Sequence, residues 1–559
     1  MKKILVALLL LFTAFACIGC NTNKTTRGGG AITGGGNTQG GGNTQGGNTN
    51  AQLTITFFNG GYGETWINNL VSRFEDKYNV KVQVNKSNEG NCAAGVAVQT
   101  GYNLSDIYIG ESMLWKSWVQ NGWLAELSDV YNTEVETSAG KQKIKDFIDP
   151  KCVGYFYSQR QLKDPTYVPW AMPWTVQPNA MAYNEDILKE IRHVSSIQVS
   201  DGVVGDDGKW VSVPKTLQDL QAFSEDCIAF NNNSAEKLAL NDTHSYVPFG
   251  WAGGINSDSI SFLITTWWAE AQGLVTSNYT GEGSFYDFFN YGNTVDSNVG
   301  QTLDMGVFKQ SGLALAYETF ANYIFDQSGN YKNTLTNPNN NNLQQLQQLF
   351  VANRVNEKPV LAIASSYLEN EVIKNRYIDS DQDGIQDVNF KFMRVPKLNA
   401  SSQNLLYGRL SDAIIVPAKA PHLDLAKKFL VFMCSEEEVY NFAKDTNGGI
   451  RPFNCDLRNA TGTEYSAFAT SLFDVYYNSN VFYEYPMNTI SHAQVSHVYR
   501  NSDPSYHGNL SWQEILRYMQ NPPAGKTVGK AISDEVIKRL TDSEVDGWIR
   551  KFRLTNITK

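Results

Sequence analysis

The stretch Tyr167–Glu185, with the sequence YVPWAMPWTVQPNAMAYNE, decides how the rest of this chain is organised. Its three prolines exclude a helix interior and disfavour a regular central strand, because proline lacks a backbone N–H. We therefore expect an extended, kinked segment followed by a short strand and a helix start at Asn184 or Asp186. Such a segment, with two tryptophans, suits a crossing between two lobes. An irregular loop that buries its tryptophans in a core would explain the same residues.

Length and charge narrow the class of protein. A chain of 559 residues is too long for one compact core and predicts two or more domains. An apolar content of 42% and a charged content of 18% are typical of a soluble globular protein. The net charge of −10 argues against nucleic acid or an anionic membrane surface as the main partner.

The N-terminus has the composition of an export signal. Two lysines precede the apolar run Ile4–Ala16, which is too short to span a membrane. Residues 1–19 resemble a bacterial lipoprotein signal peptide, so we expect Cys20 to carry the lipid; Cys17 is the weaker rival. Residues 20–51 are almost wholly Gly, Asn, Thr and Gln, which predicts a flexible tether. We expect a protein outside the cytoplasm, attached to the membrane through its lipid alone.

Five cysteines follow the signal segment, and no two of them form a CxxC pair. An exported protein can form disulfides, but the odd number leaves at least one thiol free or paired elsewhere. The spacing assigns no pairing among Cys92, Cys152, Cys227, Cys434 and Cys455.

The folded part begins with an α/β pattern. An apolar strand at Leu53–Phe58 ends in a glycine-rich loop, and a helix follows with Trp66, Leu70, Phe74 and Tyr78 on one face. Since ligands lie beyond the carboxyl ends of parallel strands, the loops at 59–63 and 85–89 fall where a cleft would be. Further strands are expected at 81–84, 105–110, 246–251, 360–364, 388–395 and 405–416, and helices at 215–230 (with Thr216 and Asp219 as a capping box), 259–273, 305–326, 423–434 and 436–445.

Several stretches, in order, resemble the extracellular solute-binding proteins of carbohydrate ABC importers, from Leu53 to about Phe453. They are ITFFNGGYGETW, SDIYIGESMLWKSW, PWAMPWTVQPNAMAYNEDIL, VPKTLQDLQAF (with Leu217 where the family usually has Trp), PVLAIASSYLENE, AKKFLVFMCSEEE and NGGIRPF. The resemblance implies a type II periplasmic-binding-protein fold of class α/β, in which each lobe is a mixed sheet flanked by helices. The chain path is then discontinuous, with lobe 1 at 52–172 plus 388–447 and lobe 2 at 173–387 plus 448–559.

The same resemblance implies a function. We expect a monomer that binds a carbohydrate, an oligosaccharide in particular, in the inter-lobe cleft and delivers it to the permease, without catalysis, cofactor or nucleic acid. Lobe closure would be a hinge motion. Two insertions, at 191–213 and 274–301, could shape the cleft or decorate the surface.

A sugar site needs flat aromatic side chains for the C–H faces and polar side chains for the hydroxyls. The resemblance places ten such residues in loops facing the cleft: Asn59, Tyr62, Glu89, Glu111, Trp115, Trp174, Gln177, Trp251, Tyr367 and Arg451. Trp174 and Trp251 are the stacking candidates, and Glu111 and Gln177 the polar ones. Other interpretations stay open: Trp115 and Trp66 could be core residues, Glu89 a solvated turn, and Arg451 the partner of a nearby carboxylate.

One acidic loop predicts a structural calcium site. Carboxylates at positions 1, 3, 5 and 9, with Gly384 at position 6, resemble a calcium-binding loop, whose ligands here would be Asp379, Asp381, Asp383, Ile385 (through its carbonyl) and Asp387. Phe390 stands at position 12, where an EF-hand has a bidentate Glu. A solvated Asp-rich turn is the alternative.

Enzyme motifs are absent from the sequence. Residues 520–527, QNPPAGKT, imitate a phosphate loop, but Gln520 replaces its first glycine and two prolines remove amide donors. There is no HExxH or GxSxG motif. A glycosidase, whose paired carboxylates need no short motif, and a surface adhesin are the two alternatives to a transport receptor.

Overall fold

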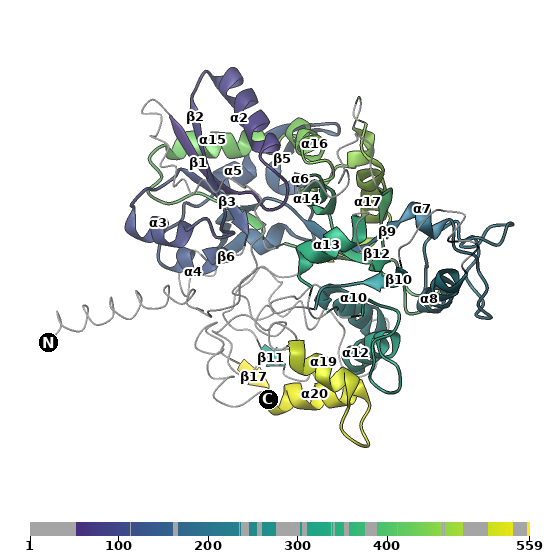
Figure 1. Ribbon diagram of the computed structural model, residues 1–559. Helices are drawn as coiled ribbons and strands as arrows, with labels where there is room; N and C mark the ends of the chain where they lie inside the picture. The colour runs from purple at the N-terminus through teal and green to yellow at the C-terminus, as the bar shows by residue number, and fades with distance from the viewer. Residues whose placement is uncertain are drawn as a thin grey trace, which may run out of the picture. The chain divides into compact units, whose positions relative to one another are not determined.

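The computed structural model describes residues 52–111, 113–159, 166–233, 235, 237, 245–253, 260–274, 302–304, 310–336, 338, 341–351, 357–374, 388–410, 412–460, 462, 464–483, 512–539 and 556–558. All of them lie in one compact unit, Asn48–Lys559. The unit is built on two larger sheets with helices packed around them, which confirms the predicted α/β class (Figure 1).

The first sheet has the strand order β2-β1-β3-β15-β8. Its strands are β1 (Leu53–Phe58), β2 (Val82–Ser87), β3 (Ile107–Glu111), β8 (Ala171–Pro173) and β15 (Asp412–Ile415). β1, β2 and β3 are parallel, while β15 is antiparallel to both β3 and β8. The carboxyl ends of β1 and β3 therefore meet at one edge of this sheet, where the sequence pattern predicted a ligand site.

The second sheet has the order β10-β12-β9-β14-β16, and β13 also pairs with β9. Its strands are β9 (Gln177–Asn184), β10 (Ser245–Gly250), β12 (Glu357–Ser365), β13 (Phe390–Met393), β14 (Leu405–Arg409) and β16 (Asn480–Tyr483). β12 is buried along almost its whole length, as its apolar run VLAIA requires. Three separate two-stranded sheets are also present: β4 (Glu134–Thr137) with β5 (Gly140–Lys143), β6 (Tyr157–Gln159) with β7 (Tyr167–Pro169), and β11 (Thr302–Asp304) with β17 (Asn556–Thr558).

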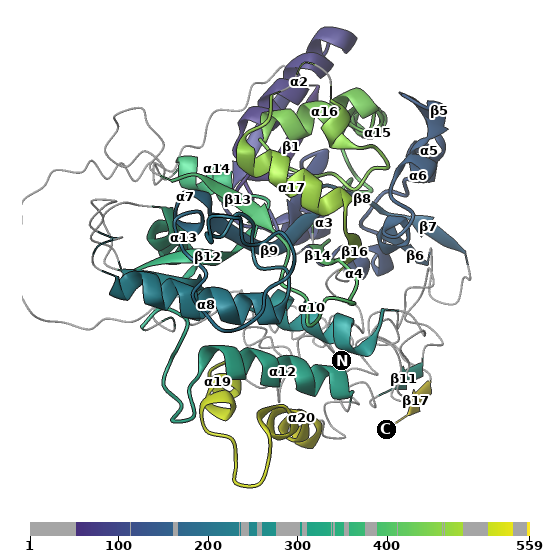
Figure 2. The same ribbon diagram turned by 90° about the vertical axis from the view of Figure 1, so that its right-hand side faces the viewer.

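Helices surround each sheet. Around the first are α2 (Thr65–Tyr78), α3 (Ala94–Thr100), α4 (Trp115–Gln120), α5 (Ser128–Asn132), α6 (Ile144–Phe147), the 3-10 turn η2 (Val153–Phe156), α15 (Leu423–Met433) and α16 (Glu436–Asp445). With the second sheet are α7 (Glu185–Leu188), α8 (Leu217–Asn232), α10 (Ser261–Gln272), α12 (Ser311–Ile324), α13 (Leu343–Val351), α14 (Leu368–Lys374), η6 (Leu457–Asn459), α17 (Ala467–Tyr477), α19 (Trp512–Gln520) and α20 (Val528–Arg539). α15 and α16 pack on α2, and α19 and α20 pack on α12 (Figures 1 and 2).

The chain passes between the sheets at short connections. β8 belongs to the first sheet and β9 to the second, so the residues between Pro173 and Gln177 form a crossing. A second crossing lies between Arg409 at the end of β14 and Asp412 at the start of β15. The lobe boundaries stay a prediction. If each lobe follows one sheet, the chain would return to lobe 1 near Asp412 and not near residue 388.

The short strand predicted in the second half of the opening stretch is confirmed, but it includes Pro178, which the prediction against a proline in a central strand had excluded. Gln177–Asn184 form a strand with neighbours on both sides, and Pro178 stands opposite Gly408 within it. Pro178 is only the second residue of the strand, so its missing N–H removes one bond at the end of the ladder. The predicted helix start is confirmed: the Asn184 side chain accepts a hydrogen bond from Ile187 N at the beginning of α7.

Local signals gave two further confirmed predictions. The four-residue spacing of Trp66, Leu70 and Phe74 produces α2, which buries these three side chains. Thr216 and Asp219 form a complete capping box at the start of α8.

The 191–213 insertion packs on α8. Trp210 is fully buried, and its Nε1 donates to Asp226 Oδ2 at 2.9 Å. The His193 Nδ1 atom lies 2.8 Å from the same carboxylate. Residues 275–301 of the other insertion lie outside the described residues. The five cysteines after the signal segment are free thiols, so no disulfide contributes here.

Candidate functional site

An aromatic cluster forms where the loop after β1 meets the residues after β12. We call it the aromatic junction and define it as Tyr62, Trp66, Trp174, Tyr367 and Phe442. The Tyr62 ring lies 6.2 Å from that of Trp174 and 6.5 Å from that of Tyr367, both edge-on, and Trp174 and Trp66 lie 5.7 Å apart at 32°. The Tyr62 hydroxyl and the Ser366 hydroxyl are 2.9 Å apart. The junction therefore joins elements of both sheets.

Glycines make this approach possible. Gly60 and Gly61 have positive φ angles of 41° and 85°. A Cβ on Gly60 would lie 3.1 Å from the Trp174 ring, and one on Gly61 would lie 3.0 Å from Tyr367 Cβ. The loop can come this close only because both positions lack side chains.

A buried carboxylate lies beside the aromatic junction. Asp412 is fully buried, and its Oδ2 accepts hydrogen bonds from the Thr175 hydroxyl and from Gln177 Nε2, the latter at 2.9 Å. Asp412 stands directly opposite Glu111 in the β15–β3 pair, and the Arg409 guanidinium lies 3.9 Å from Glu111 Oε2. We call these five residues the Asp412 cluster. Burial raises the pKa of Tyr62 far above its ordinary value, and the negative charge of Asp412 adds to the effect.

Several buried polar atoms at this place have no hydrogen-bond partner within the described part of the chain. They are Asn59 Oδ1, Trp66 Nε1, Trp174 Nε1 and Ser365 Oγ. A buried donor or acceptor left unpaired costs about 1–3 kcal/mol, so native proteins leave few of them. Donors and acceptors of this kind beside aromatic faces are suited to pair with the hydroxyls of a ligand or with water.

The structure therefore brings six of the ten predicted residues together. Asn59, Tyr62, Trp174 and Tyr367 lie at the aromatic junction, and Glu111 and Gln177 lie in the Asp412 cluster. The other four residues, Glu89, Trp115, Trp251 and Arg451, are placed differently.

Glu89 and Trp115 flank Glu111 in different ways. Glu89 is exposed in a turn, where Ser87 Oγ donates to its backbone oxygen. A Cβ at the neighbouring Gly90 would lie 2.6 Å from Glu111 Cγ, so this turn packs directly against Glu111. Trp115 is buried at the first turn of α4 with 3% of its surface exposed. Both positions fit their alternative interpretations, a solvated turn and a core residue.

Trp251 and Arg451 are also buried. Trp251 follows β10, its ring contacts Phe320 at 5.7 Å, and its Nε1 has no partner among the described residues. β10 and β12 are parallel, so Trp251 lies at the same sheet edge as Ser365. Arg451 donates to Trp174 O and to Met433 O, and thereby fixes the backbone of the first crossing.

The family model for bacterial extracellular solute-binding proteins matches residues 69–470. The chain belongs to this family. Among solved structures, the apo form of RafE from Streptococcus pneumoniae is similar at 13% identity over 87% of this chain and 97% of that chain, with a TM-score of 0.50. The GacH receptor of Streptomyces glaucescens, solved unliganded and with acarbose, is similar at 13% identity over 89% of this chain and 98% of that chain, also with a TM-score of 0.50. No curated protein matches the chain.

Both solved structures support the two-lobed fold of this solute-binding protein. Three residues that the fold places at the candidate site were not predicted from the sequence: Asp412, Thr175 and Ser366. Asp412 carried a usable signal, because it is a lone carboxylate at the head of the apolar run AIIV, in a strand that becomes buried. Thr175 and Ser366 carried none, because their contacts depend on tertiary structure.

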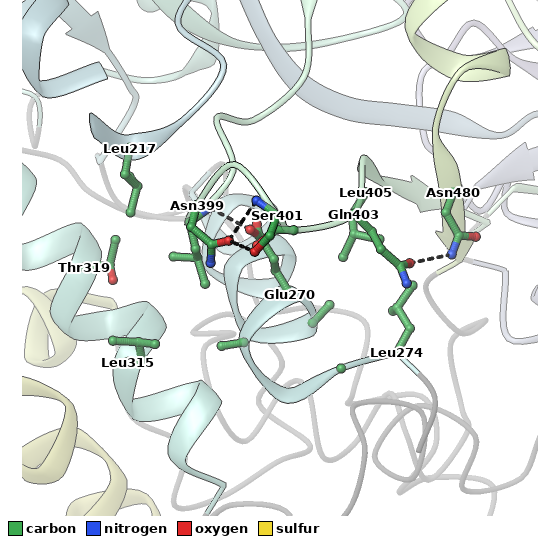
Figure 3. Close-up of a pocket in the computed structure, with 15 residues that line it drawn as sticks. Leu217, Glu270, Leu274, Leu315, Thr319, Asn399, Ser401, Gln403, Leu405 and Asn480 are labelled. Carbon is green, nitrogen blue, oxygen red and sulfur yellow. Dashed lines mark hydrogen bonds between the residues drawn. The ribbon is translucent and has the colours of Figure 1, made fainter. Parts of the chain in front are cut away.

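A cavity of about 830 Å³ in the solute-binding protein lies away from the ten predicted residues (Figure 3). Leu405 and Asn480 line it at the amino ends of β14 and β16, whereas Arg409 of the Asp412 cluster ends β14. The Glu270 carboxylate at its wall accepts a hydrogen bond from Leu398 N at 2.7 Å, and burial raises the pKa of Glu270 to about 7. Its described lining residues include no aromatic side chain. We therefore place the candidate site at the aromatic junction instead.

The predicted metal and lipid sites of this solute-binding protein lie outside the described residues. Within the described ranges, no three His, Cys, Asp or Glu side chains are grouped to hold a metal ion. The predicted calcium loop at 379–387 and the predicted lipid-bearing Cys20 lie outside those ranges. Across the described helices, none is long and apolar enough to cross a membrane.

Proposed function

We propose that this solute-binding protein captures a carbohydrate, in particular an oligosaccharide, outside the cytoplasm and delivers it intact to the permease of an ABC importer. Family membership supports binding of a solute. The acarbose complex of the GacH receptor supports a carbohydrate, since acarbose is what that protein was solved with. Lipid anchoring through Cys20, a monomeric state and a calcium ion at 379–387 belong to the same proposal.

One observation carries it: buried aromatic side chains and unpartnered polar atoms lie side by side at the aromatic junction, where a sugar would reach them when the lobes open. Sugars offer apolar C–H faces and hydroxyls, and these two features are their physical complement. Trp174 would pack against the sugar ring while its Nε1 donates to a hydroxyl, and Asn59 Oδ1 would accept from another.

Asp412 would act through another residue in this proposal. It accepts from Gln177 Nε2, so the Gln177 amide oxygen stays oriented by a fixed partner. Glu111 would bind a further hydroxyl, and Tyr62, Trp251 and Tyr367 would enclose the sugar. Arg451 holds the crossing backbone in place. Glu89, which is exposed beside Glu111, would contact the outer end of a longer ligand, and the buried Trp115 would support that wall from the core.

The test is a calorimetric and thermal-shift screen of residues 52–559 against mono- and oligosaccharides, with the sugar recovered and analysed afterwards. A bound sugar at a hundredfold excess over Kd stabilises the fold by about 2.7 kcal/mol. We expect saturable binding of one sugar class and recovery of intact sugar. Recovery of cleaved sugar would show that the protein is a glycosidase and not a receptor. If no sugar shifts the melting temperature, the carbohydrate assignment is overturned.

Two tryptophan variants then locate the site. Trp174→Phe keeps an aromatic ring but removes an N–H that has no partner among the described residues, so we expect weaker sugar binding, by about tenfold or 1.4 kcal/mol, together with some loss of stability because phenylalanine is smaller than the buried indole. Trp267→Phe is the control, because Trp267 Nε1 donates to Pro396 O at 2.9 Å inside the core. It should lower the melting temperature and leave the affinity unchanged. Equal affinities in Trp174→Phe and the unaltered protein would contradict this placement.

A further inference from the structure

A second pocket, of about 360 Å³, lies beside the β9–β13 strand pair. Its size falls within the range of small-molecule sites. Tyr183 of β9 and Phe392 of β13 contribute aromatic side chains to its wall, Val213 ends the 191–213 insertion, and Pro214 follows it. None of the ten predicted sugar-site residues is in its lining.

Three cationic side chains line this pocket: Lys215, Arg394 and Lys397. Its described lining residues include no Asp or Glu. Such a concentration of positive charge is unexpected in a chain with a net charge of −10, in which acidic partners are plentiful.

The hydrogen bonds of these three side chains go to neutral oxygens. Lys215 Nζ donates to Asp201 O at 2.7 Å, and Lys397 Nζ donates to Ala400 O and Ser402 O, each at 3.0 Å. The Arg394 guanidinium has longer bonds, from one Nη to Ser479 Oγ at 3.3 Å and to Asn478 O at 3.4 Å.

Arg394 differs from the arginines of this chain that pair with a carboxylate. Arg73, Arg458 and Arg539 each form an ion pair with a carboxylate. In the described part of the chain Arg394 has none, although it is half-buried. Burial accordingly lowers the pKa of Arg394, with no nearby carboxylate to offset the cost of desolvating its charge.

Carboxylates on neighbouring elements have other partners. Glu185 pairs with Lys189 and Lys391, and Asp219 accepts from the backbone N–H groups of Ser200, Lys215 and Thr216. Glu270, on the other side of the 397–403 loop, attracts Lys397 electrostatically but hydrogen-bonds to Leu398 N. Within the described part of the chain, none of the three cations therefore forms an ion pair with a carboxylate.

We propose that this pocket binds a small phosphate-class oxyanion that carries an aromatic or apolar group. The planar Arg394 guanidinium can bind two oxyanion oxygens at once, and the two lysines add compact charges. Tyr183 and Phe392 provide the surface for the apolar part. Charge-assisted hydrogen bonds of this kind contribute about 1.5–3 kcal/mol each.

This site is separate from the proposed sugar site. Tyr183 lies six positions beyond Gln177 on β9, which is about 20 Å at roughly 3.3 Å per residue. Oxyanion binding and sugar binding can therefore be measured independently in the same protein, and failure of one leaves the other intact.

The experiment is isothermal calorimetry of the 52–559 chain with phenyl phosphate, inorganic phosphate and phenol. Phenyl phosphate should bind most tightly, inorganic phosphate more weakly, and phenol not measurably. We expect Arg394→Gln to weaken phenyl phosphate by about tenfold or more, and Lys215→Gln to weaken it less. Lys141→Gln, which makes the same charge change in β5, should have no effect.

Lys215 is exposed, so its variant keeps the test valid even if Arg394→Gln fails to fold. Equal affinities of phenyl phosphate for the unaltered protein, Lys215→Gln and Lys141→Gln would overturn the site. A lipid headgroup offers the same oxyanion, so sedimentation with phosphatidylglycerol vesicles separates the two sources. Vesicle binding without phenyl phosphate binding would also overturn the proposal, in favour of a membrane contact.

Discussion

At the scale of single residues, Glu369 shows how a buried carboxyl group connects elements of both sheets. It lies on α14, has 6% of its surface exposed, and accepts hydrogen bonds from the Asn447 amide and, at 2.6 Å, from the Ser466 hydroxyl. No Lys, Arg or His in the described part forms an ion pair with it. Burial therefore raises the pKa of Glu369 from 4.5 to about 7.

This raised pKa predicts a pH dependence. Between about pH 4.5 and 7 the folded state holds the proton more tightly than the unfolded state, so the stability that this group contributes below pH 4.5 is lost as the pH rises to 7. Glu369→Gln keeps an acceptor oxygen and removes the charge. We expect it to raise the free energy of unfolding at pH 8 by about 2 kcal/mol, and by about half as much at pH 5.5.

Urea denaturation at the two pH values measures this difference. Glu464→Gln, at an exposed position nearby, is the control and should change stability little at either pH. If Glu369→Gln leaves the free energy of unfolding at pH 8 unchanged or lowers it, burial does not destabilise the charged form of Glu369.

The residue scale is also where sequence reasoning was weakest. Asn59 and Tyr62 stand in a loop at a strand end, which local pattern predicts, whereas Trp174 and Tyr367 were proposed through the family resemblance. Asp412 could not be placed, since its position opposite Glu111 depends on the β15–β3 register. Trp115 was ambiguous for a related reason: helical spacing cannot distinguish a buried side chain from one facing a cleft.

At the scale of elements, the loop after β1 contacts the residues after β12, and two glycines in this loop allow a matched comparison. Gly61 and Gly63 both have positive φ angles, of 85° and 77°. A Cβ on Gly61 would meet Tyr367, whereas one on Gly63 would have nothing within 4 Å. Alanine at either position strains the backbone, but only at Gly61 does it also displace a neighbour.

We therefore expect Gly61→Ala and Gly63→Ala both to lower the free energy of unfolding by about 1–2 kcal/mol. Gly61→Ala should also weaken carbohydrate binding by about tenfold or 1.4 kcal/mol, because it separates the loop from Tyr367. Urea unfolding and calorimetry with the sugar found in the screen measure the two effects. Identical affinities in the two variants would show that the loop contact plays no part in binding.

Element-level prediction from sequence worked where the signal was local. The apolar spacing gave α2, and the pair Thr216–Asp219 gave the capping box of α8. It failed at Pro178, where the strand forms because its partners β12, β13 and β14 supply hydrogen bonds to the residues beyond the proline. Those partner strands come from distant parts of the chain, and the local sequence does not predict them.

At the scale of the whole molecule, the two sheets share their chain segments. β8 and β9 are separated by three residues, Trp174, Thr175 and Val176, yet they belong to different sheets. β14 and β15 repeat this arrangement in the opposite direction. Melting one sheet therefore releases strand ends that anchor the other.

We expect a single cooperative thermal transition for residues 52–559, with equal calorimetric and van't Hoff enthalpies. Differential scanning calorimetry measures both. Adding the bound sugar should move the whole transition upward without splitting it. Two resolved transitions in the absence of sugar would contradict the coupling of the sheets.

The position of β15 between β3 and β8 has a consequence for how the chain acquires its structure. β3 and β8 do not pair with each other, and the strand that joins them begins only at Asp412. The first sheet cannot be completed until this late segment has been synthesised. Folding that depends on such distant pairing is slow, because the entropy of closing a long loop is lost before the contacts form. During synthesis, the first sheet of the nascent chain therefore stays incomplete until Asp412–Ile415 has been made.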